Sequence, residues 1–393
     1  MSNKYANSIF LLGHPQTAMG EGVQISKFSA LLKNEGYQVE GLIDLCAFFG
    51  EKFESIAELN YALASADDLP LTALENVKPI VERLNQIQSH HVLLLSWCFG
   101  VAAVQATGLF SKKNVISKFY VHHPDERVLP KLYNAASLLI TESLLANQKG
   151  IEYGIDREKL LYIPHHYPLI AESFSEKHAG EKVVVGVVGR LDRGKNVEHA
   201  LEVVRLLIAK GAPIELFLMG DFGEDTIYNQ NLEQMLDCYC HEPWLIWDKE
   251  KVPYPDVLQK YQQCDLFLQL SGAEAGSNVI VELLGMGKPV VLLDCSTNPY
   301  LFKGGACFVK GDGALYPGPL PFSRPCMEDL EEKVAELIAE KGRRKELAQA
   351  ARLLAQKRFH PNVASKRMPL LFSQEKEAIR HIYEEDRREY GLE

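Results

Sequence analysis

Long hydrophobic runs are missing from this sequence. No stretch approaches the roughly 18 consecutive apolar residues that a membrane span requires. Its first residues, MSNKYANSIFLLGHPQ, lack the cationic start and extended apolar run of a secretory signal. We therefore expect a cytoplasmic protein without an integral membrane span, for which weak peripheral membrane contact stays open.

An excess of positive charge is missing as well. The chain has 42 Lys and Arg against 52 Asp and Glu, a formal net charge of -10. This balance, without any long basic tract, argues against a general affinity for nucleic-acid phosphates. In the N-terminal half only Lys112 and Lys113 form a small basic cluster. A strongly anionic membrane acceptor is therefore not favoured.

Cysteine pairs at metal-binding spacing are also absent. The eight cysteines are scattered, and the only close pair, Cys238 and Cys240, has no second pair nearby at finger-like spacing. Most others, such as Cys264 and Cys295, lie within apolar patterns. We expect reduced core thiols and no metal site.

What the chain does contain is an alternation of short apolar runs with helical patterns. Its 393 residues, 47% hydrophobic, exceed what one core normally organises, which favours two α/β domains. In the first half, strands are predicted at 8–13, 37–45, 91–97, 115–123, 137–141 and 159–164, and a helix at 23–34. This βαβ pattern predicts a parallel sheet covered on both faces, with ligands at the carboxyl ends of the strands.

A second series of elements follows an irregular, linker-like stretch at residues 165–182. Strands are predicted at 183–190, 214–221, 244–248, 266–271 and 289–295, and helices at 196–211, 327–341, 343–359 and 374–390. This alternation of strands and helices again predicts a doubly wound α/β domain.

A basic turn joins the first strand and helix of this second series. Residues 189–196 read Gly-Arg-Leu-Asp-Arg-Gly-Lys-Asn, so Arg190 and Lys195 lie where a helix dipole also attracts anions. Alone, the motif fits a phosphate site and a solvated loop about equally well.

An acidic segment follows the predicted strand 266–271. Glu274 lies before a helix and Glu282 within it, roughly two turns further on. Ser277 and Asn278 lie at the expected helix start, where backbone N–H groups could bind phosphate. The alternative is an ordinary capped helix with one exposed and one paired glutamate.

Together these segments resemble a known family. A GR-x4-K turn, an E-x7-E segment at 274–282 and the run Gly-Lys-Pro-Val-Val at 287–291 resemble the retaining GT-B glycosyltransferases of group 1, or family 4. Gly220 falls where that family has a glycine-containing loop near the nucleotide. The combination is far more specific than its parts.

The resemblance implies a GT-B architecture of two Rossmann-like doubly wound domains facing each other across a cleft. Residues 1–170 would form an N-terminal acceptor domain and residues 181–365 a C-terminal donor domain. Residues 366–393 would form a C-terminal helix that could cross back onto the first domain.

The resemblance also implies roles for single residues. Arg190 and Lys195 would hold the donor diphosphate, assisted by Ser277 and Asn278 at the helix start. Glu282 would bind the ribose and Glu274 the transferred sugar. The family is generally metal-independent, because cations and helix N-termini can stabilise the leaving diphosphate. No metal and no cofactor are therefore expected.

The match in the N-terminal half is weaker. Gly13 and a turn at Gly20 and Gly22 resemble the loop that closes over the donor, although such loops are common after a first strand. His122 or His123, with a slight preference for His122, would contact the donor sugar near the reaction centre. The pair at residues 165–166 is a second histidine candidate.

Several departures from the family pattern stand out. The histidine pair at 165–166 replaces a common Asn-Gly, and Ala-Gly-Ser at 275–277 replaces a frequent Gly-Phe-Gly. Asn196 stands where glycine is common. A Pro- and Gly-rich loop at 311–325 could border the site or be a simple insertion.

The predicted function is that of a hexosyltransferase-type enzyme. It would move a sugar, with retention, from a nucleoside diphosphate sugar, expected to be a UDP-sugar, to an unidentified acceptor hydroxyl. The main alternative is a non-catalytic GT-B subunit that stabilises a partner transferase. A dehydrogenase ranks lower, because no convincing G-x-G-x-x-G turn with its ribose-binding acid is present.

Overall fold

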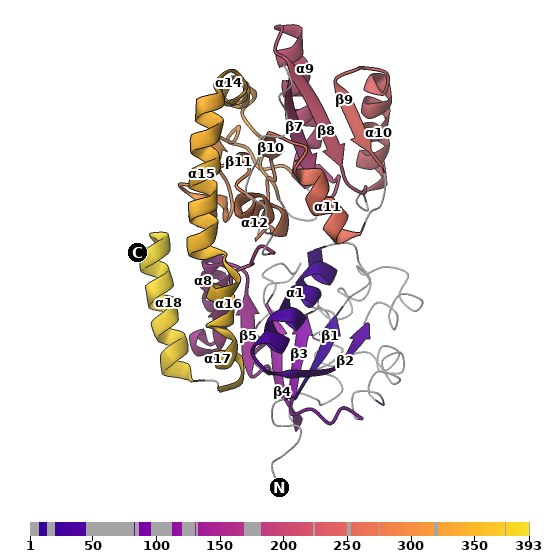
Figure 1. The fold of residues 1–393 in the computed structure, drawn as a ribbon. Coiled ribbons are helices and arrows are strands. Elements are labelled where there is room, and N and C mark those ends of the chain that lie inside the picture. The colour runs from indigo at the N-terminus through magenta and orange to yellow at the C-terminus, as the bar shows by residue number, and fades with distance from the viewer. Residues whose placement is uncertain are drawn as a thin grey trace. The chain divides into compact units, whose positions relative to one another are not determined.

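The computed structural model divides the chain into two compact units (Figure 1). Unit 1 comprises residues 1–164 and 362–393, and unit 2 comprises residues 165–361. The structure describes residues 8–13, 20–44, 82, 86–95, 112–119, 130, 133–168, 182–222, 225–249, 253–274, 276–317, 321–373 and 375–392.

Unit 1 is built on a six-stranded sheet of order β2-β1-β3-β4-β5-β6, with every neighbouring pair parallel. Its strands are β1 (Ser8–Gly13), β2 (Gln38–Asp44), β3 (His91–Leu95), β4 (Asn114–Lys118), β5 (Leu138–Thr141) and β6 (Leu160–Tyr162). The central strands β3, β4 and β5 are buried along their whole length. Such burial requires cover on both faces, which explains their nearly continuous apolar sequences.

Helices cover both faces of this sheet. They are α1 (Gly20–Asn34), α8 (Leu144–Glu152), the 3₁₀ turn η1 (Arg157–Lys159), α16 (Pro361–Ser365), α17 (Met368–Ser373) and α18 (Lys376–Tyr390). Leu32 of α1, Met368 of α17 and Ile379 of α18 share one core with alternate residues of the strands. On the opposite face, α8 approaches Leu160 closely at Gly150. The C-terminal segment is therefore part of the core of unit 1.

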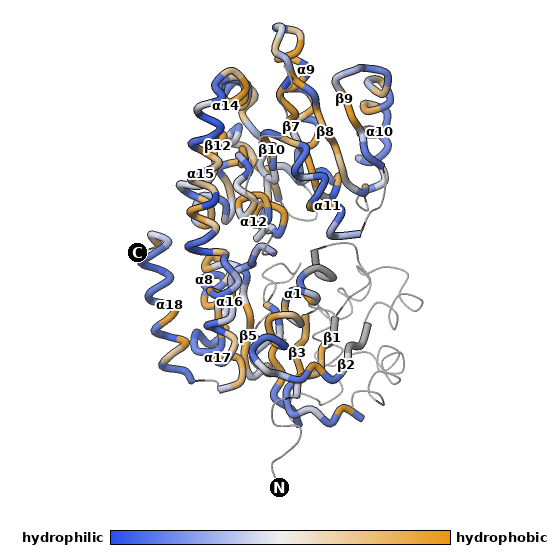
Figure 2. Tube along the Cα trace, viewed as in Figure 1, coloured by the Kyte–Doolittle hydropathy of each residue, from blue (hydrophilic) through white to orange (hydrophobic). Residues whose placement is uncertain are grey.

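Unit 2 contains a second parallel six-stranded sheet, of order β12-β11-β10-β7-β8-β9. Its strands are β7 (Val183–Val188), β8 (Ile214–Met219), β9 (Leu245–Asp248), β10 (Leu266–Gln269), β11 (Val290–Leu293) and β12 (Cys307–Val309). Figure 2 shows β7 and β8 as largely hydrophobic, in keeping with burial on both faces.

The helices of unit 2 also form two layers. They are α9 (Val197–Ala209), α10 (Thr226–Tyr239), α11 (Tyr254–Tyr261), α12 (Asn278–Gly285), α13 (Asn298–Phe302), α14 (Met327–Ala339) and α15 (Lys341–Arg358), with the 3₁₀ turn η2 (Arg193–Lys195). Helices α9, α10 and α14 share one core with the sheet. On the other face Tyr261 of α11 packs against Phe267, and α12 packs on β11 and α15.

The predicted doubly wound organisation is confirmed in both units. The start of the first helix differs from the prediction: it begins at Gly20 rather than Val23, so that Gly20 and Gly22 lie in its first turn and not in a loop before it. Glycine has a low helix propensity, which made these residues look like a turn, but a first helical turn tolerates it.

Buried thiols have little thiolate character in this fold. Burial raises the pKa of Cys264 to about 12 and that of Cys295 to about 11. Cys264 therefore acts as a small apolar group in the core, whereas the half-buried Cys295 donates its thiol to the Ser271 carbonyl at 3.4 Å.

Candidate functional site

The centre of the second sheet is a topological switch point. Strands β7 and β10 are neighbours, but the chain continues from β7 toward β8 and β9 and from β10 toward β11 and β12. In doubly wound sheets the crevice at the carboxyl ends of two such strands is the usual ligand site. The basic turn follows β7 and the acidic segment follows β10, so the topology brings both predicted motifs to this crevice.

The basic turn closes with an unusual backbone conformation. After β7 the chain forms η2 and then Asn196, which has φ 54° and ψ 39° and immediately precedes α9. Asparagine tolerates this left-handed region better than most residues. The turn is thus a short 3₁₀ element followed by a kink, and not a direct strand-to-helix junction.

A second loop packs closely against this turn at Gly220. A Cβ atom on Gly220 would lie 1.7 Å from the carbonyl oxygen of Gly189. Next to this contact, the Leu191 N–H donates to the Asp221 carbonyl at 2.7 Å. Only glycine permits this approach, so Gly220 holds the loop after β8 against the basic turn.

Lys195 and Glu274 meet across the switch point, although 79 positions separate them. The Lys195 Nζ lies 2.9 Å from Glu274 Oε2 and 3.0 Å from Ser271 Oγ. The two charged side chains are 29% and 11% exposed. A cation and a carboxylate are therefore held together at the rim of the crevice, partly shielded from water.

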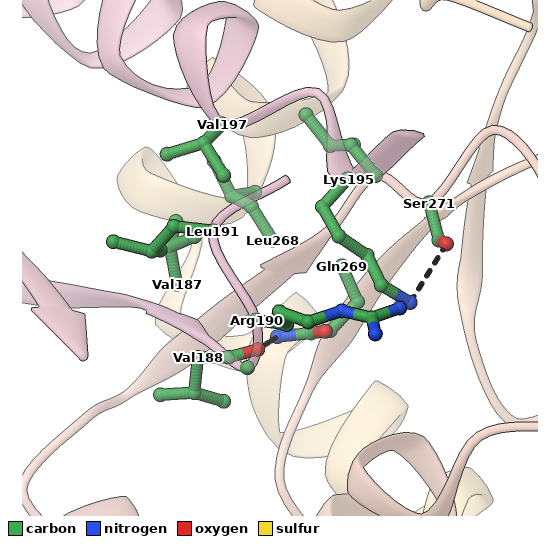
Figure 3. Close-up of a pocket in the computed structure, with 11 residues that line it drawn as sticks. Val187, Val188, Arg190, Leu191, Lys195, Val197, Leu268, Gln269 and Ser271 are labelled. Carbon is green, nitrogen blue, oxygen red and sulfur yellow. Dashed lines mark hydrogen bonds between the residues drawn. The ribbon is translucent and has the colours of Figure 1, made fainter. Parts of the chain in front are cut away.

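Arg190 shares a small pocket with Lys195 (Figure 3). Its Nε donates to Asp192 Oδ2 at 2.6 Å, and 46% of its side chain is exposed. Gln269 lines the same pocket and donates to the Val188 carbonyl at 3.0 Å, which fixes β10 to β7. The structure thus brings Arg190, Lys195 and Glu274 together.

The start of α12 is capped by Ser277, whose Oγ accepts from the Ile280 N–H at 3.3 Å. Asn278 is the first helical residue. Glu274, three residues before the cap, is fixed through its main chain, because its carbonyl accepts from Thr297 Oγ1 at 2.8 Å. The carboxylate of Glu274 is therefore presented from an anchored backbone.

Glu282 lies deeper, in the buried part of α12. It is 2% exposed, and its Oε1 accepts from the Tyr254 hydroxyl at 2.5 Å. Burial, and then the adjacent carboxylate, raise the pKa of Tyr254 well above its usual value. The phenol therefore stays protonated and acts as a donor to Glu282. Sequence reasoning did not single out Tyr254, which has no motif signal.

Lys288, within the 287–291 run, has a structural role. It is 3% exposed and donates to the carbonyls of Gln262 and Cys264 at 3.1 and 2.8 Å. These bonds tie the end of α11 to the strand that follows α12. This part of the sequence motif lies at the amino ends of β10 and β11, at the opposite edge of the sheet from the crevice.

The N-terminal candidates are placed less completely. His122 and His123 lie outside the described residues. Gly13 ends β1, and Gly20 and Gly22 lie in the first turn of α1. Within the described ranges, no helix is long and apolar enough to cross a bilayer, and no group of three His, Cys, Asp or Glu side chains could hold a metal ion.

Part of the chain matches a known family. Residues 170–354 match the model of the family described as Glycosyl transferases group 1. No curated protein matches the chain.

Solved structures resemble the chain over nearly its whole length. Anabaena Alr3699/HepE, in complex with UDP and glucose, is 16% identical with a TM-score of 0.67, covering 93% of this chain and 99% of that one. Sucrose-phosphate synthase from Thermosynechococcus elongatus is 13% identical with a TM-score of 0.72, covering 94% and 98%. A glycosyltransferase from Rickettsia africae is 16% identical with a TM-score of 0.68, covering 93% and 98%.

The fold is therefore GT-B, with two Rossmann-like doubly wound domains. The segment that matches the Glycosyl transferases group 1 model, residues 170–354, lies within unit 2.

Proposed function

We propose that this protein is a retaining glycosyltransferase of the family 4 type that moves a hexosyl group from a UDP-sugar to an acceptor hydroxyl. The observation that carries the proposal is the meeting of Lys195 with Glu274 at the switch point of the second sheet. One group suits a diphosphate and the other a sugar hydroxyl, so together they fit an activated sugar.

The donor class is supported from two directions. The matching segment belongs to a glycosyl transferase family model. One similar structure contains UDP and glucose and another contains UDP-glucose. The GT-B fold alone would not specify a donor, because one fold hosts many functions.

In this proposal, the diphosphate binds to Arg190 and Lys195 and to the N–H groups at the start of α12, near Ser277 and Asn278. Because Gly220 has no side chain, the backbone of the loop after β8 could approach the diphosphate closely. Positive groups at the leaving phosphate stabilise the charge that develops there, so we expect turnover without a metal ion.

The sugar would bind to Glu274 and the ribose to Glu282. In the transfer, the bond between the anomeric carbon and the leaving phosphate oxygen breaks. The acceptor oxygen bonds to the same face of that carbon, and its proton passes to the departing phosphate. Glu282 is buried and accepts a hydrogen bond from Tyr254, so in this proposal the ribose would meet a carboxylate whose position is already fixed.

The proposal is tested by measuring UDP release from UDP-glucose, UDP-galactose and UDP-N-acetylglucosamine, with GDP-mannose and ADP-glucose as comparisons, in the presence of EDTA. We expect selective turnover of a UDP-sugar and, with an acceptor supplied, a product of unchanged anomeric configuration by NMR. Tight UDP binding with no turnover of any donor would instead support a non-catalytic subunit. Turnover that requires a divalent metal would contradict the expected metal independence.

A further inference from the structure

Asn196 is completely buried beside the candidate donor site. Its side chain is 0% exposed, and its backbone has the left-handed φ of 54°. It directly follows Lys195 and precedes the first residue of α9. A glycine could adopt the same backbone conformation without a side chain, so the buried amide itself needs an explanation.

The amide group of Asn196 joins two separate loops. Its Nδ2 donates to the Leu270 carbonyl at 2.8 Å and to the Ser323 carbonyl at 2.9 Å. Leu270 directly precedes Ser271, which contacts Lys195. Ser323 belongs to the 311–325 loop, which is described except for residues 318–320. Both donors of one side chain are therefore used to connect the loop after β10 with a distant segment.

Main-chain hydrogen bonds beside this amide join the same three segments. The Gly272 N–H donates to the Gly194 carbonyl at 2.8 Å, and the Ser323 N–H donates to the Gly272 carbonyl at 3.0 Å. A Cβ atom on Gly272 would lie only 2.0 Å from the Ser323 oxygen. The basic turn, the loop after β10 and the 311–325 loop are thus fastened to one another next to Lys195.

The 311–325 loop has its own internal support. Antiparallel bridges join Gly311 to Pro325 and Tyr316 to Phe322, and the Arg324 guanidinium lies 3.9 Å above the Tyr316 ring. Phe322 is buried. The residues around Ser323 are therefore held in place by these contacts, and the Ser323 carbonyl is a fixed acceptor for Asn196.

We propose that Asn196 is a positioning residue of the donor site. Through its two hydrogen bonds it sets the distance between Lys195 on the basic turn and Ser271 and Glu274 on the loop after β10, with the 311–325 loop as the outer brace. This inference rests on the proposed function for the statement that Lys195 binds the donor diphosphate.

One detail separates this role from simple stabilisation. The Asn196 Oδ1 is buried and has no hydrogen-bond partner among the described residues. A buried acceptor without a partner costs stability. Against this cost stand the two hydrogen bonds that the Nδ2 group donates to the loops carrying the charged side chains.

The test compares Asn196→Gly with Asn196→Asp and the wild type. Glycine keeps the backbone conformation and removes both N–H donors, whereas aspartate keeps the shape but places one carboxylate oxygen against both carbonyls. Amide hydrogen exchange is measured first, without nucleotide. We expect the N–H groups of Gly272 and Ser323 to exchange at least about tenfold faster in Asn196→Gly, and faster still in Asn196→Asp.

UDP affinity is then measured by calorimetry. We expect the Kd for UDP to rise about tenfold in Asn196→Gly, because Lys195 is no longer held in place. The control is Asn147→Ala, which removes another buried amide, from unit 1. It should lower thermal stability without changing exchange at Gly272 or UDP affinity.

Unchanged exchange at Gly272 and Ser323 in Asn196→Gly would overturn the inference, as would faster exchange with wild-type UDP affinity. If the Asn196 variants do not fold, Gly272→Ala gives the same test, because its Cβ would displace Ser323; faster exchange with weaker UDP binding is again the expected result. Failure of the wild type to bind UDP would count against the proposed donor. The exchange rates at Gly272 and Ser323 would still show whether the Asn196 amide holds the two loops together.

Discussion

The Lys195 ammonium is paired with the Glu274 carboxylate at 2.9 Å. Each group neutralises the charge of the other. In the proposed function, an incoming diphosphate would compete with Glu274 for Lys195, and the sugar would compete with Lys195 for Glu274. Binding of the whole donor would satisfy both groups at once, whereas free UDP would replace only one side of the pair.

Glu274→Gln separates these two effects. We expect UDP affinity to stay the same or to rise by about two- to tenfold, because Lys195 loses a competing anion in a partly exposed pair. Turnover should fall by roughly 100-fold or more, because a group that contacts the reacting sugar is lost. Calorimetry with UDP measures the affinity, and a UDP-release assay measures the turnover. Wild-type turnover in this variant would remove Glu274 from the mechanism.

Lys195→Ala should weaken UDP binding by about 10- to 100-fold, since it removes a charged donor to phosphate. The matched control is Lys182→Ala. Lys182 also forms an ion pair, with Glu215 at 2.8 Å, but it lies at the amino end of β7. Calorimetry at two salt concentrations should show a smaller salt dependence for Lys195→Ala than for the control. Equal affinities for the two variants would argue against the phosphate site.

The strands were predictable because burial on both faces of a sheet leaves a nearly continuous apolar run. Most long helices were predictable because their buried face recurs every three to four residues. The predicted strand at 183–190 appears as β7 and the predicted helix at 196–211 as α9. Strand β12 was missed, because three residues are too short to show a period. Several predicted ends ran a residue or more too long, as at Gly189 and Arg190 after β7 and at Gly220 and Asp221 after β8.

The candidate site was predictable only in part. Arg190, Lys195 and Glu274 could be found because charged residues after strands of a doubly wound sheet converge at one edge. Tyr254 and Asn196 could not, because a tyrosine that meets a buried carboxylate and an asparagine that bridges two loops depend on distant contacts. In the sequence, Asn196 stands out only because the family pattern commonly has glycine at this position.

Gly220→Ala should destabilise the protein by about 1–3 kcal/mol, because the added methyl group would collide with the Gly189 carbonyl. The basic turn must then shift, so UDP affinity should fall as well. Gly342→Ala is the matched control. Gly342 lies in α15 with no atom within 4 Å of the added Cβ, so we expect a neutral or slightly stabilising change of up to about 1 kcal/mol. Denaturant unfolding measures both; a neutral Gly220→Ala would mean that the two loops separate at little cost.

His199 should make stability depend on pH. Burial lowers its pKa below the usual 6.5, against the opposing effect of Glu198, and Arg324 lowers it further. The unfolded chain therefore takes up the proton first, so this contribution to stability is complete above about pH 6.5 and is lost as the pH falls toward the lower folded pKa.

We expect the melting temperature to drop on going from pH 7.5 to 5.5, and to drop less in His199→Gln, which cannot be protonated. The control His381→Gln changes an imidazole that is 70% exposed and should leave the wild-type pH profile unaltered. Differential scanning calorimetry at several pH values provides the comparison. Identical pH profiles for His199→Gln and the wild type would show that the buried imidazole is not the group whose protonation destabilises the fold.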